Sequence, residues 1–326
     1  MATIEDVVKK SGVSRSTVFR FLNGSNVRAD AKKAIIQAMQ DLNYKTDHIY
    51  KHHNISIDVS IARNFEGFQG FAEIVQGITR QADERGIHVN LVRHTGEQIT
   101  HNYERWNAEQ DLKGVIVIGK NKEDETLEKE MLKNKNIPHI FVNRVFEEEK
   151  ISYVSVDLKQ AACDIVDYLI QKGHRKIAVI GKPDQLKVDE DKMNGYRKAF
   201  KKHGLPVDEK YICSVQSSKE WEEKTHAILS SKEIPTAYFG ICDSHAIKFI
   251  HIAESYGYKV PKDIAVVGMD DVEVAAYSNP TLTTVHIPFR KMGILAVDRL
   301  LELIMDEDIG STQTILGHKL VERGSS

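Results

Sequence analysis

Residues 3–23 read TIEDVVKKSGVSRSTVFRFLN, and this stretch decides the fold of the N-terminal head. Thr3, followed three residues later by Asp6, fits a capping box, in which a hydroxyl and an acid satisfy the first backbone amides of a helix. Gly12 is placed to end that helix, and a second helix is expected over residues 15–22. Two short helices with a tight glycine turn between them are typical of a helix-turn-helix.

A third helix completes the head. Asp30 is placed to cap it, and its apolar stripe is formed by Ala34, Ile35, Ala38, Met39 and Leu42. On the second helix Arg15, Ser16 and Arg20 are expected to face outward, and an arginine fork matches the guanine acceptors of the DNA major groove. The pattern predicts DNA binding and leaves a generic three-helix bundle with a charged surface as the alternative.

The charge distribution points the same way. Residues 1–53 hold nine lysines and arginines against five acids, whereas the rest of the 326-residue chain holds 36 against 42. A basic head on an acidic body suggests that the head meets a polyanion, and chance clustering is the other interpretation.

Several classes of protein are excluded. No run approaches the roughly 20 apolar residues of a membrane span, and the N-terminus lacks the apolar core of a signal peptide. The cysteines (Cys163, Cys213 and Cys242) lie far apart, which is typical of a reducing compartment. We therefore expect a cytoplasmic protein without membrane contact. Dinucleotide, P-loop, zinc-protease and serine-hydrolase motifs are absent from the sequence, so we expect neither an enzyme nor a cofactor.

The body alternates short apolar strands with amphipathic helices. Strands are expected at 57–62, 88–92, 114–119, 139–142, 176–180, 237–241 and 264–268. Helices are expected at 71–85, 103–112, 124–134, 158–171, 193–202, 221–231, 244–256 and 289–305, followed by a polar tail. This alternation predicts an α/β fold with two doubly wound parallel sheets, whose strand ends meet at a ligand cleft.

The expected organisation has three parts. They are a helix-turn-helix head at 1–46, a hinge at 47–56 and an effector-binding and dimerisation body at 57–326. Within the body we expect a first lobe of about 57–157 with 289–312, and a second lobe of about 158–288 with 313–326.

Ordered motifs along the whole chain resemble the lactose/galactose-repressor family. They include Ser11-Gly12-Val13-Ser14, Leu42-Asn43-Tyr44, Gly173-His174-Arg175, Val266-Val267-Gly268 and Asp270-Asp271. The resemblance implies a bilobed body like that of periplasmic binding proteins, and a homodimer that binds a pseudo-palindromic operator. It also implies base contacts from Arg15, Ser16 and Arg20, and backbone contacts from Ser14, Thr17, Asn23 and Lys32. Phe19, Phe21 and Ala31 depart from the family pattern, so some phosphate contacts are expected to be missing.

The hinge departs most from the family. Thr46, Asp47, Tyr50 and His53 stand where the family has a helix-starting proline, an asparagine, an alanine and a leucine that wedges into the minor groove. Either Tyr50 replaces that wedge, or Lys51, His52 and His53 contact phosphates without a strong kink. His48 and His52 have a metal-like spacing but no third ligand nearby, so we expect no metal.

The resemblance also places an effector site. It assigns ligand contacts to Phe65, Phe68, Phe71, Lys192, Trp221 and Asp270, with core packing as the competing interpretation for the aromatic residues. Because acids such as Glu66, Asp189 and Asp191 surround this cleft, we expect a sugar or amino sugar rather than a phosphorylated ligand. The sequence thus predicts an effector-controlled transcription regulator. A sugar sensor with weakened or lost operator binding is the alternative that the altered hinge leaves open.

Overall fold

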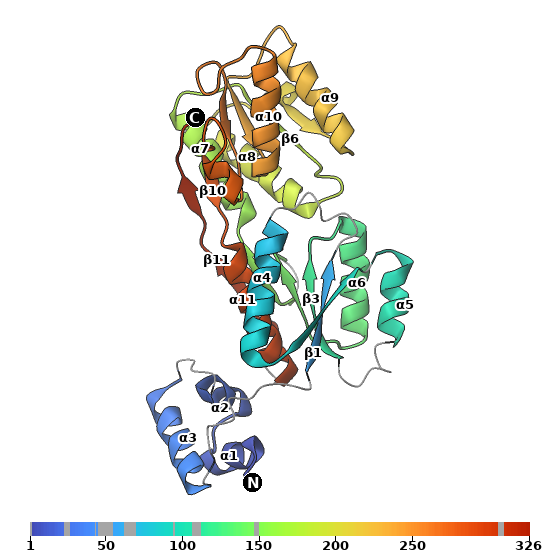
Figure 1. Ribbon diagram of the computed structural model, residues 1–326, viewed down its shortest axis with the longest axis vertical. Coiled ribbons are helices and arrows are strands. Elements are labelled where there is room, and N and C mark those ends of the chain that lie inside the picture. Colours follow the sequence, from blue (N-terminus) through green and yellow to red (C-terminus); the bar gives the residue numbers. More distant parts are fainter. Residues whose placement is uncertain are drawn as a thin grey trace.

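The computed structural model describes residues 2–22, 27–42, 44, 55–61, 70–93, 95–105, 112–146, 150–305 and 310–326. A small helical head lies at one end of an elongated molecule, and two α/β lobes follow it along the long axis (Figure 1). The C-terminus lies in the lobe farthest from the head. Within these ranges, no helix has the length and apolar character that crossing a membrane requires.

The head is a three-helix unit. Its helices are α1 (Ile4–Ser11), α2 (Arg15–Leu22) and α3 (Ala29–Asp41). Gly12 ends α1 with a φ of +66°, a left-handed conformation that glycine adopts without strain. Helix α3 begins after Arg28, so Asp30 lies in its first turn instead of capping it. There its negative charge interacts favourably with the positive end of the helix dipole. Val18 and Ile35 are fully buried between the helices.

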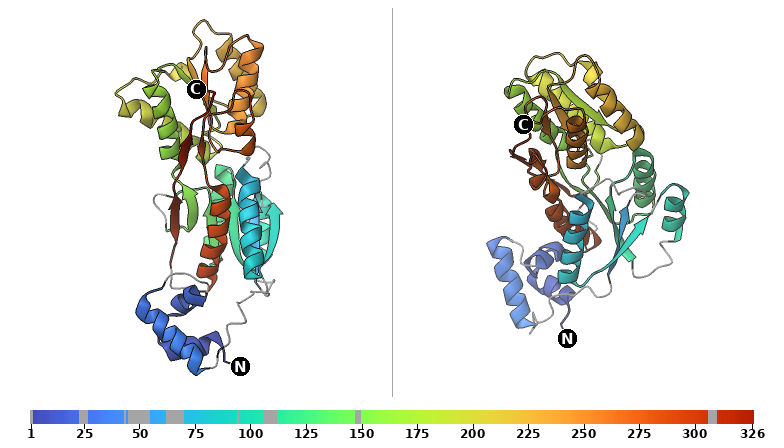
Figure 2. Two further views of the ribbon diagram at one scale, coloured as in Figure 1. Left: turned by 60° about the vertical axis from the view of Figure 1, so that its left-hand side comes forward. Right: turned by 45° about the horizontal axis from the view of Figure 1, so that its top comes forward.

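The first lobe is built on a parallel sheet whose described strands run in the order β11-β5-β4-β3-β1-β2. The strands are β1 (Ser56–Ile61), β2 (His88–Arg93), β3 (Leu112–Ile118), β4 (His139–Val142), β5 (Tyr153–Val156) and β11 (Gln313–Leu316). The helices are α4 (Gly70–Arg85), α5 (Glu97–Arg105), α6 (Lys122–Asn134) and α11 (Phe289–Met305). Helices α4 and α11 cover one face of the sheet, and α5 and α6 cover the other (Figures 1 and 2).

The second lobe carries a parallel sheet of order β7-β6-β8-β9. Its strands are β6 (Ile177–Gly181), β7 (Ile212–Ser214), β8 (Ala237–Gly240) and β9 (Ala265–Val267), with the antiparallel pair β10 (Thr284–His286) and β12 (Lys319–Val321) beside it. Its helices are α7 (Leu158–Gln171), α8 (Lys187–Lys202), α9 (Ser218–Leu229) and α10 (Asp243–Ser255), with 3-10 turns at Glu209–Tyr211 and Glu273–Ala276.

Helices α4 and α11 pack side by side at unusually close range (Figure 2). A Cβ on Gly77 would lie 2.1 Å from the Arg290 carbonyl oxygen, and one on Gly293 would lie 2.1 Å from the Ile74 carbonyl oxygen. Real Cβ atoms do not approach backbone so closely, so the two glycines let these helices meet backbone to backbone.

The structure differs from the sequence expectation at several element boundaries. The helix expected at 103–112 is α5, which ends at Arg105, and β3 already begins at Leu112. Helix α8 starts at Lys187 rather than 193. Leu186 precedes it and makes no side-chain capping hydrogen bond, so no capping residue marked this start in the sequence. Strands β5 and β7 were not expected as strands.

The C-terminal segment was expected to be a polar tail of the second lobe from residue 313 onward. Instead β11 pairs in parallel with β5 of the first sheet, and the chain then crosses to pair β12 with β10. The boundary between the lobes therefore falls after Leu316. The alternating exposure of these short edge strands gives them little hydrophobic signal.

Candidate functional site

The outward face of α2 carries the polar residues that the sequence assigned to it. Arg15 and Arg20 are exposed, Ser16 is half-buried, and the Arg15 guanidinium lies 3.0 Å from the Glu5 carboxylate. Such an exposed ion pair contributes little, about 0–1 kcal/mol, so another anion can displace Glu5. Lys32 is exposed on α3.

Hydroxyl groups gather at the start of α2. The Ser14 Oγ lies 3.0 Å from the Ser16 Oγ and 2.9 Å from the Thr17 Oγ1, and it accepts a hydrogen bond from the Thr17 amide. A helix N-terminus that carries several hydroxyls is a suitable site for a phosphate. Arg28, which the sequence analysis did not single out, lines a groove together with Thr17 and Arg20.

Phe19 is part of the core of the head. Its side chain is only 7% exposed and clusters with Val7 and Val18, with Phe21 partly buried against them. Met305, the last residue of α11, packs against the same cluster. Phe19, which stands where the family has a polar residue, therefore enlarges a small apolar core instead of facing solvent.

Some sequence-assigned residues lie outside the described residues. They are Asn23 of the head, Tyr50 and His53 of the hinge, and Phe65 and Phe68 before α4.

Lys192 and Asp270 meet in the second lobe, at the carboxyl ends of its strands. The Lys192 ammonium donates a 2.7 Å hydrogen bond to the Ile241 carbonyl and lies 3.8 Å from an Asp270 carboxylate oxygen. Both side chains are over nine-tenths buried. Asp270 has a φ of +125°, which is rare for a residue other than glycine and is typical of functional sites.

Acids outnumber the lysine at this point. Burial opposes the charge on Lys192, but Asp270 and Asp189 outweigh that effect and raise its pKa. Burial raises the pKa of Asp270 well above its usual value, and neighbouring Asp243 and Asp189 add to the rise while Lys192 opposes it. Burial also raises the pKa of Asp243 to about 6. One buried lysine therefore lies among three buried acids. Asp189 accepts a hydrogen bond from the Lys182 amide, and Asp243 accepts from Thr284 and the Val272 amide, so a hydrogen-bond donor or a cation would be favoured at Asp270.

Aromatic side chains pack beside this group. Trp221 is buried and stacks on His245, with ring centroids 4.9 Å apart. The Trp221 indole nitrogen, the His245 Nδ1 and the Tyr238 hydroxyl are buried and have no hydrogen-bond partner among the described residues. Burial lowers the pKa of His245 to about 4, so this imidazole is neutral. Unpaired buried polar atoms are costly and are expected where a ligand completes the bonding.

Phe71 lies on the first lobe, in the first turn of α4, half-buried against the main core. The structure thus brings Lys192 and Asp270 into contact, places Trp221 on the second lobe and leaves Phe71 on the first. His245 and Tyr238 were missed because a histidine inside a helix and a tyrosine inside a strand carry no motif.

The first lobe contains a buried ionic network that the sequence did not reveal. The Glu128 carboxylate lies 3.1 Å from the Lys120 ammonium and accepts 2.5 Å hydrogen bonds from Ser60 and Tyr103. Lys120 also donates to the carbonyl of Ile61, the last residue of β1. The network therefore holds the carboxyl ends of β1 and β3 together, at the edge that faces the second lobe.

Direct contacts join the two lobes. The Lys122 amide donates to the Gln185 carbonyl at 2.9 Å, and the Lys122 ammonium lies 2.7 Å from the Glu190 carboxylate. Arg144 lies 3.8 Å from Asp191. These contacts connect the first turn of α6 and the end of β4 with the first turns of α8.

Two family models match the chain. The model for bacterial regulatory proteins of the lacI family matches residues 3–47, and the model for a periplasmic binding protein-like domain matches residues 166–326. The probable HTH-type transcriptional repressor ExuR of Bacillus subtilis (strain 168) is 28% identical and is matched over 100% of this chain and 98% of its own length. The HTH-type transcriptional repressor PurR of Photorhabdus laumondii subsp. laumondii is 29% identical, with 100% and 97% covered.

Solved structures agree with these matches. A complex of the transcriptional regulator CelR with cellobiose has a TM-score of 0.75 at 26% identity and covers 100% of both chains. A lac repressor dimer bound to operator and the anti-inducer ONPF has a TM-score of 0.71 at 25% identity, with 99% of this chain and 98% of the other covered.

Proposed function

Because the chain belongs to the lacI family of bacterial regulatory proteins, we propose that it binds a pseudo-palindromic operator as a homodimer, under the control of a sugar or amino sugar. Its full-length relatives are transcriptional repressors, so the chain is a transcriptional repressor with an effector-binding body and not an enzyme.

The head supports the operator half of this proposal. Arg15 and Arg20 are exposed on α2, and hydroxyls surround its N-terminus, so base-reading and phosphate-binding groups lie on one helix. In a two-fold dimer, two such helices address two half-sites about one DNA turn apart.

The acidic side chains around Lys192 support the effector part of the proposal. Asp270 is a hydrogen-bond acceptor that ligand hydroxyl or amino groups can satisfy, whereas a second anion would add to the repulsion that already raises the pKa of Asp270. The similarity to a regulator solved with cellobiose supports a sugar. Lys192 offers a point charge without the fork of an arginine, so it fixes ligand orientation less tightly.

Calorimetric titration tests the effector assignment. We expect glucosamine, glucose or cellobiose to bind the full chain, and Asp270→Asn to weaken that binding by about tenfold or more, because a charged acceptor is lost. Glu254→Gln, which changes an exposed acid on α10, is the matched control and should leave binding unchanged. A sugar phosphate whose tight binding depends on Asp270 would contradict the assignment.

Selection of bound duplexes from a random DNA library tests the operator assignment at fixed, moderate salt. We expect a two-fold symmetric site. If no sequence is preferred with or without the sugar that binds, then operator binding is not the function of this head.

A further inference from the structure

The turn that carries Asp270 has an unusual backbone. Asp270 has a φ of +125° and Asp271 has a φ of +59°, so two successive residues adopt conformations that favour glycine. Such residues are strained, and they persist only where the surrounding contacts determine their conformation. The contacts of this turn therefore decide where the Asp270 carboxylate points.

Backbone contacts secure both ends of the turn. The Asp270 amide donates a 2.9 Å hydrogen bond to the Val285 carbonyl of β10. At the other end, the Val272 amide donates to the Asp243 carboxylate at 2.9 Å. Neither of these contacts reaches the side chain of Asp271, which lies between the two ends.

The Asp271 carboxylate is held by a guanidinium and an imidazole. The Arg323 guanidinium donates to its Oδ1 at 2.7 Å, and the His286 Nδ1 lies 3.1 Å from its Oδ2. Arg323 also donates to the Leu282 carbonyl at 2.8 Å. The Arg323 and Asp271 side chains are only 20% and 17% exposed, so this ion pair is better shielded from water than a surface pair.

Arg323 is itself fixed by the residues after it. Ser325 is fully buried, and its carbonyl accepts a 2.7 Å hydrogen bond from the Val266 amide of β9. The Ser325 hydroxyl donates to the Val266 carbonyl at 2.6 Å and accepts from the Thr283 amide at 2.9 Å. The end of the chain is thus bonded to β9, and Arg323 has little freedom of position.

The segment before Arg323 reaches back to the first lobe. Strand β12 pairs with β10, and the chain passes from β11 of the first sheet to β12 through Gly317 and His318. The His318 Nε2 lies 2.7 Å from the Asp164 carboxylate of α7. The residues that support Asp270 are therefore connected to both lobes.

We propose that Arg323 is a positioning residue for effector binding, which holds the Asp271 carboxylate and thereby aims the neighbouring Asp270 carboxylate at the ligand. The proposal rests on the assignment of Asp270 to the effector site. An arginine suits this task because its planar fork donates in fixed directions to a carboxylate and a carbonyl at once, whereas a lysine supplies one flexible ammonium. Because Asp270 lies 3.8 Å from the Lys192 ammonium, a shift of the turn would change the distance between this acceptor and its cation.

Calorimetric titration of the full chain with glucosamine, glucose and cellobiose tests the proposal. For the sugar that binds, we expect Arg323→Gln to weaken binding by about tenfold, as is typical of residues that orient a ligand-binding side chain. Arg323→Lys should recover part of the loss, because it keeps a positive charge beside Asp271. Asp271→Asn is a second variant that should weaken binding in the same way, since asparagine tolerates a positive φ and leaves the backbone unstrained.

Arg197→Gln is the matched control. Arg197 donates to the Glu209 carboxylate at 2.8 Å, so this substitution also breaks an arginine–carboxylate pair of the second lobe. Glu209 precedes β7, which lies at the opposite edge of the sheet from β9. Binding of the sugar by Arg197→Gln should therefore match that of wild type.

A double variant separates positioning from a general loss of stability. If Arg323 acts through Asp270, then Arg323→Gln should have little further effect on binding in the Asp270→Asn background, so the two substitutions should not be additive. Equal losses in both backgrounds would show that Arg323 has a structural role only, and would overturn the proposal.

Amide hydrogen exchange provides a readout that needs no ligand. The Asp270 amide should exchange faster in Arg323→Gln than in wild type because the turn opens more often, while the Val179 amide of the central strand β6 should be unchanged. An Asp270 amide that is equally protected in both proteins would overturn the proposal, as would sugar binding that Asp270→Asn weakens and Arg323→Gln does not. Binding of none of these sugars, or binding that survives Asp270→Asn, would instead contradict the effector assignment, and the exchange comparison would still test the hold of Arg323 on the turn.

Discussion

Replacing Lys192 by methionine tests the electrostatic account of the cleft. Methionine keeps an unbranched side chain of similar length, so the substitution removes the charge with little loss of packing. The change leaves Asp270 and Asp189 without the cation that opposes their repulsion.

The expected loss of stability follows from two contributions and one offset. Breaking a buried ion pair from one side costs about 3–5 kcal/mol. The lost hydrogen bond from Lys192 to the Ile241 carbonyl adds about 1 kcal/mol. Proton uptake by Asp270 offsets part of this cost, because burial already raises its pKa. We therefore expect a decrease of roughly 3 kcal/mol in the free energy of unfolding at neutral pH.

The pH dependence has a definite sign. Without Lys192, the pKa of Asp270 in the folded state rises further above its unfolded value of about 3.9. A group with a raised folded pKa stabilises the protein below its unfolded pKa and loses that contribution as pH rises through the folded pKa. The deficit of Lys192→Met relative to wild type should therefore be small near pH 4 and grow toward pH 8.

Urea unfolding of wild type, Lys192→Met and the exposed control Lys219→Met at pH 5 and pH 8 measures this deficit. The control should stay within about 0.5 kcal/mol of wild type at both values. A deficit for Lys192→Met that is below about 1 kcal/mol at pH 8, or that shrinks as pH rises, would refute the assigned pairing.

Three further outcomes are expected. In binding to selected duplexes, Arg15→Ala should cost about 1–3 kcal/mol on the best site and relax base preference, whereas Lys32→Ala should weaken all sequences equally. Gly293→Ala should destabilise the body by at least about 1–3 kcal/mol in urea, because its Cβ would collide with backbone, while exposed Lys291→Ala should be neutral. In an NMR titration the His245 imidazole should remain neutral from pH 8 down to about pH 5. Because its folded pKa is depressed, its contribution to stability should be lost as pH falls from about 6.5 toward 4.

The features that the sequence predicted well have local causes. The capping box at Thr3 and the left-handed turn at Gly12 specify α1 and the start of the helix-turn-helix without tertiary contacts. The alternation of apolar strands and helices predicts two parallel sheets, because each element carries its own periodicity. The family resemblance assigned Lys192 and Asp270 separately to one effector site without predicting that they pair, and the structure places them 3.8 Å apart.

The features that the sequence missed depend on contacts between distant segments. The ionic network of Glu128 joins residues up to 68 positions apart, and no spacing along the chain signals it. The end segment was expected to be a tail because strand β11 is an edge strand with an alternating and weak apolar pattern, and only its pairing with β5 defines it. The buried Asn143 Oδ1, which has no hydrogen-bond partner among the described residues, becomes visible only when burial and hydrogen bonding are known together.

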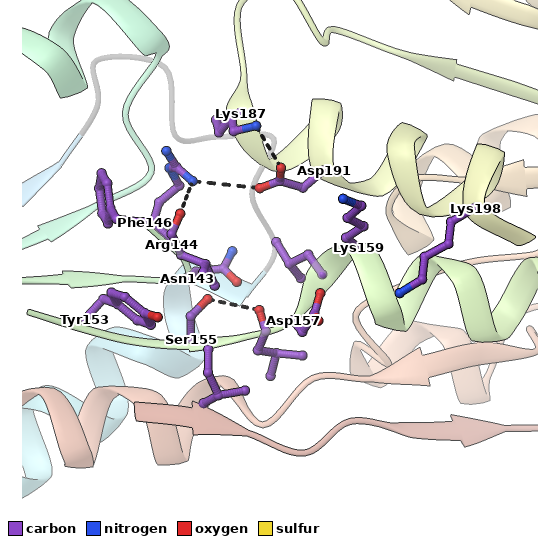
Figure 3. A pocket seen from close by; sticks show the side chains of 14 residues that line it. Asn143, Arg144, Phe146, Tyr153, Ser155, Asp157, Lys159, Lys187, Asp191 and Lys198 are labelled. Carbon is purple, nitrogen blue, oxygen red and sulfur yellow. Dashed lines mark hydrogen bonds and ion pairs between the residues drawn. The ribbon is translucent and has the colours of Figure 1, made fainter. Parts of the chain in front are cut away.

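Helix α8 connects these observations. One of its faces carries Lys192 toward buried acids, and the next residue, Asp191, pairs with Lys187 at 2.9 Å and lies 3.8 Å from Arg144 of the first lobe (Figure 3). Its first turns also hold the first lobe through Glu190 and Lys122. A ligand at Lys192 that displaces α8 must change these inter-lobe contacts, so effector binding is coupled to the arrangement of the lobes through this helix, by the ligand's differential affinity for the two arrangements.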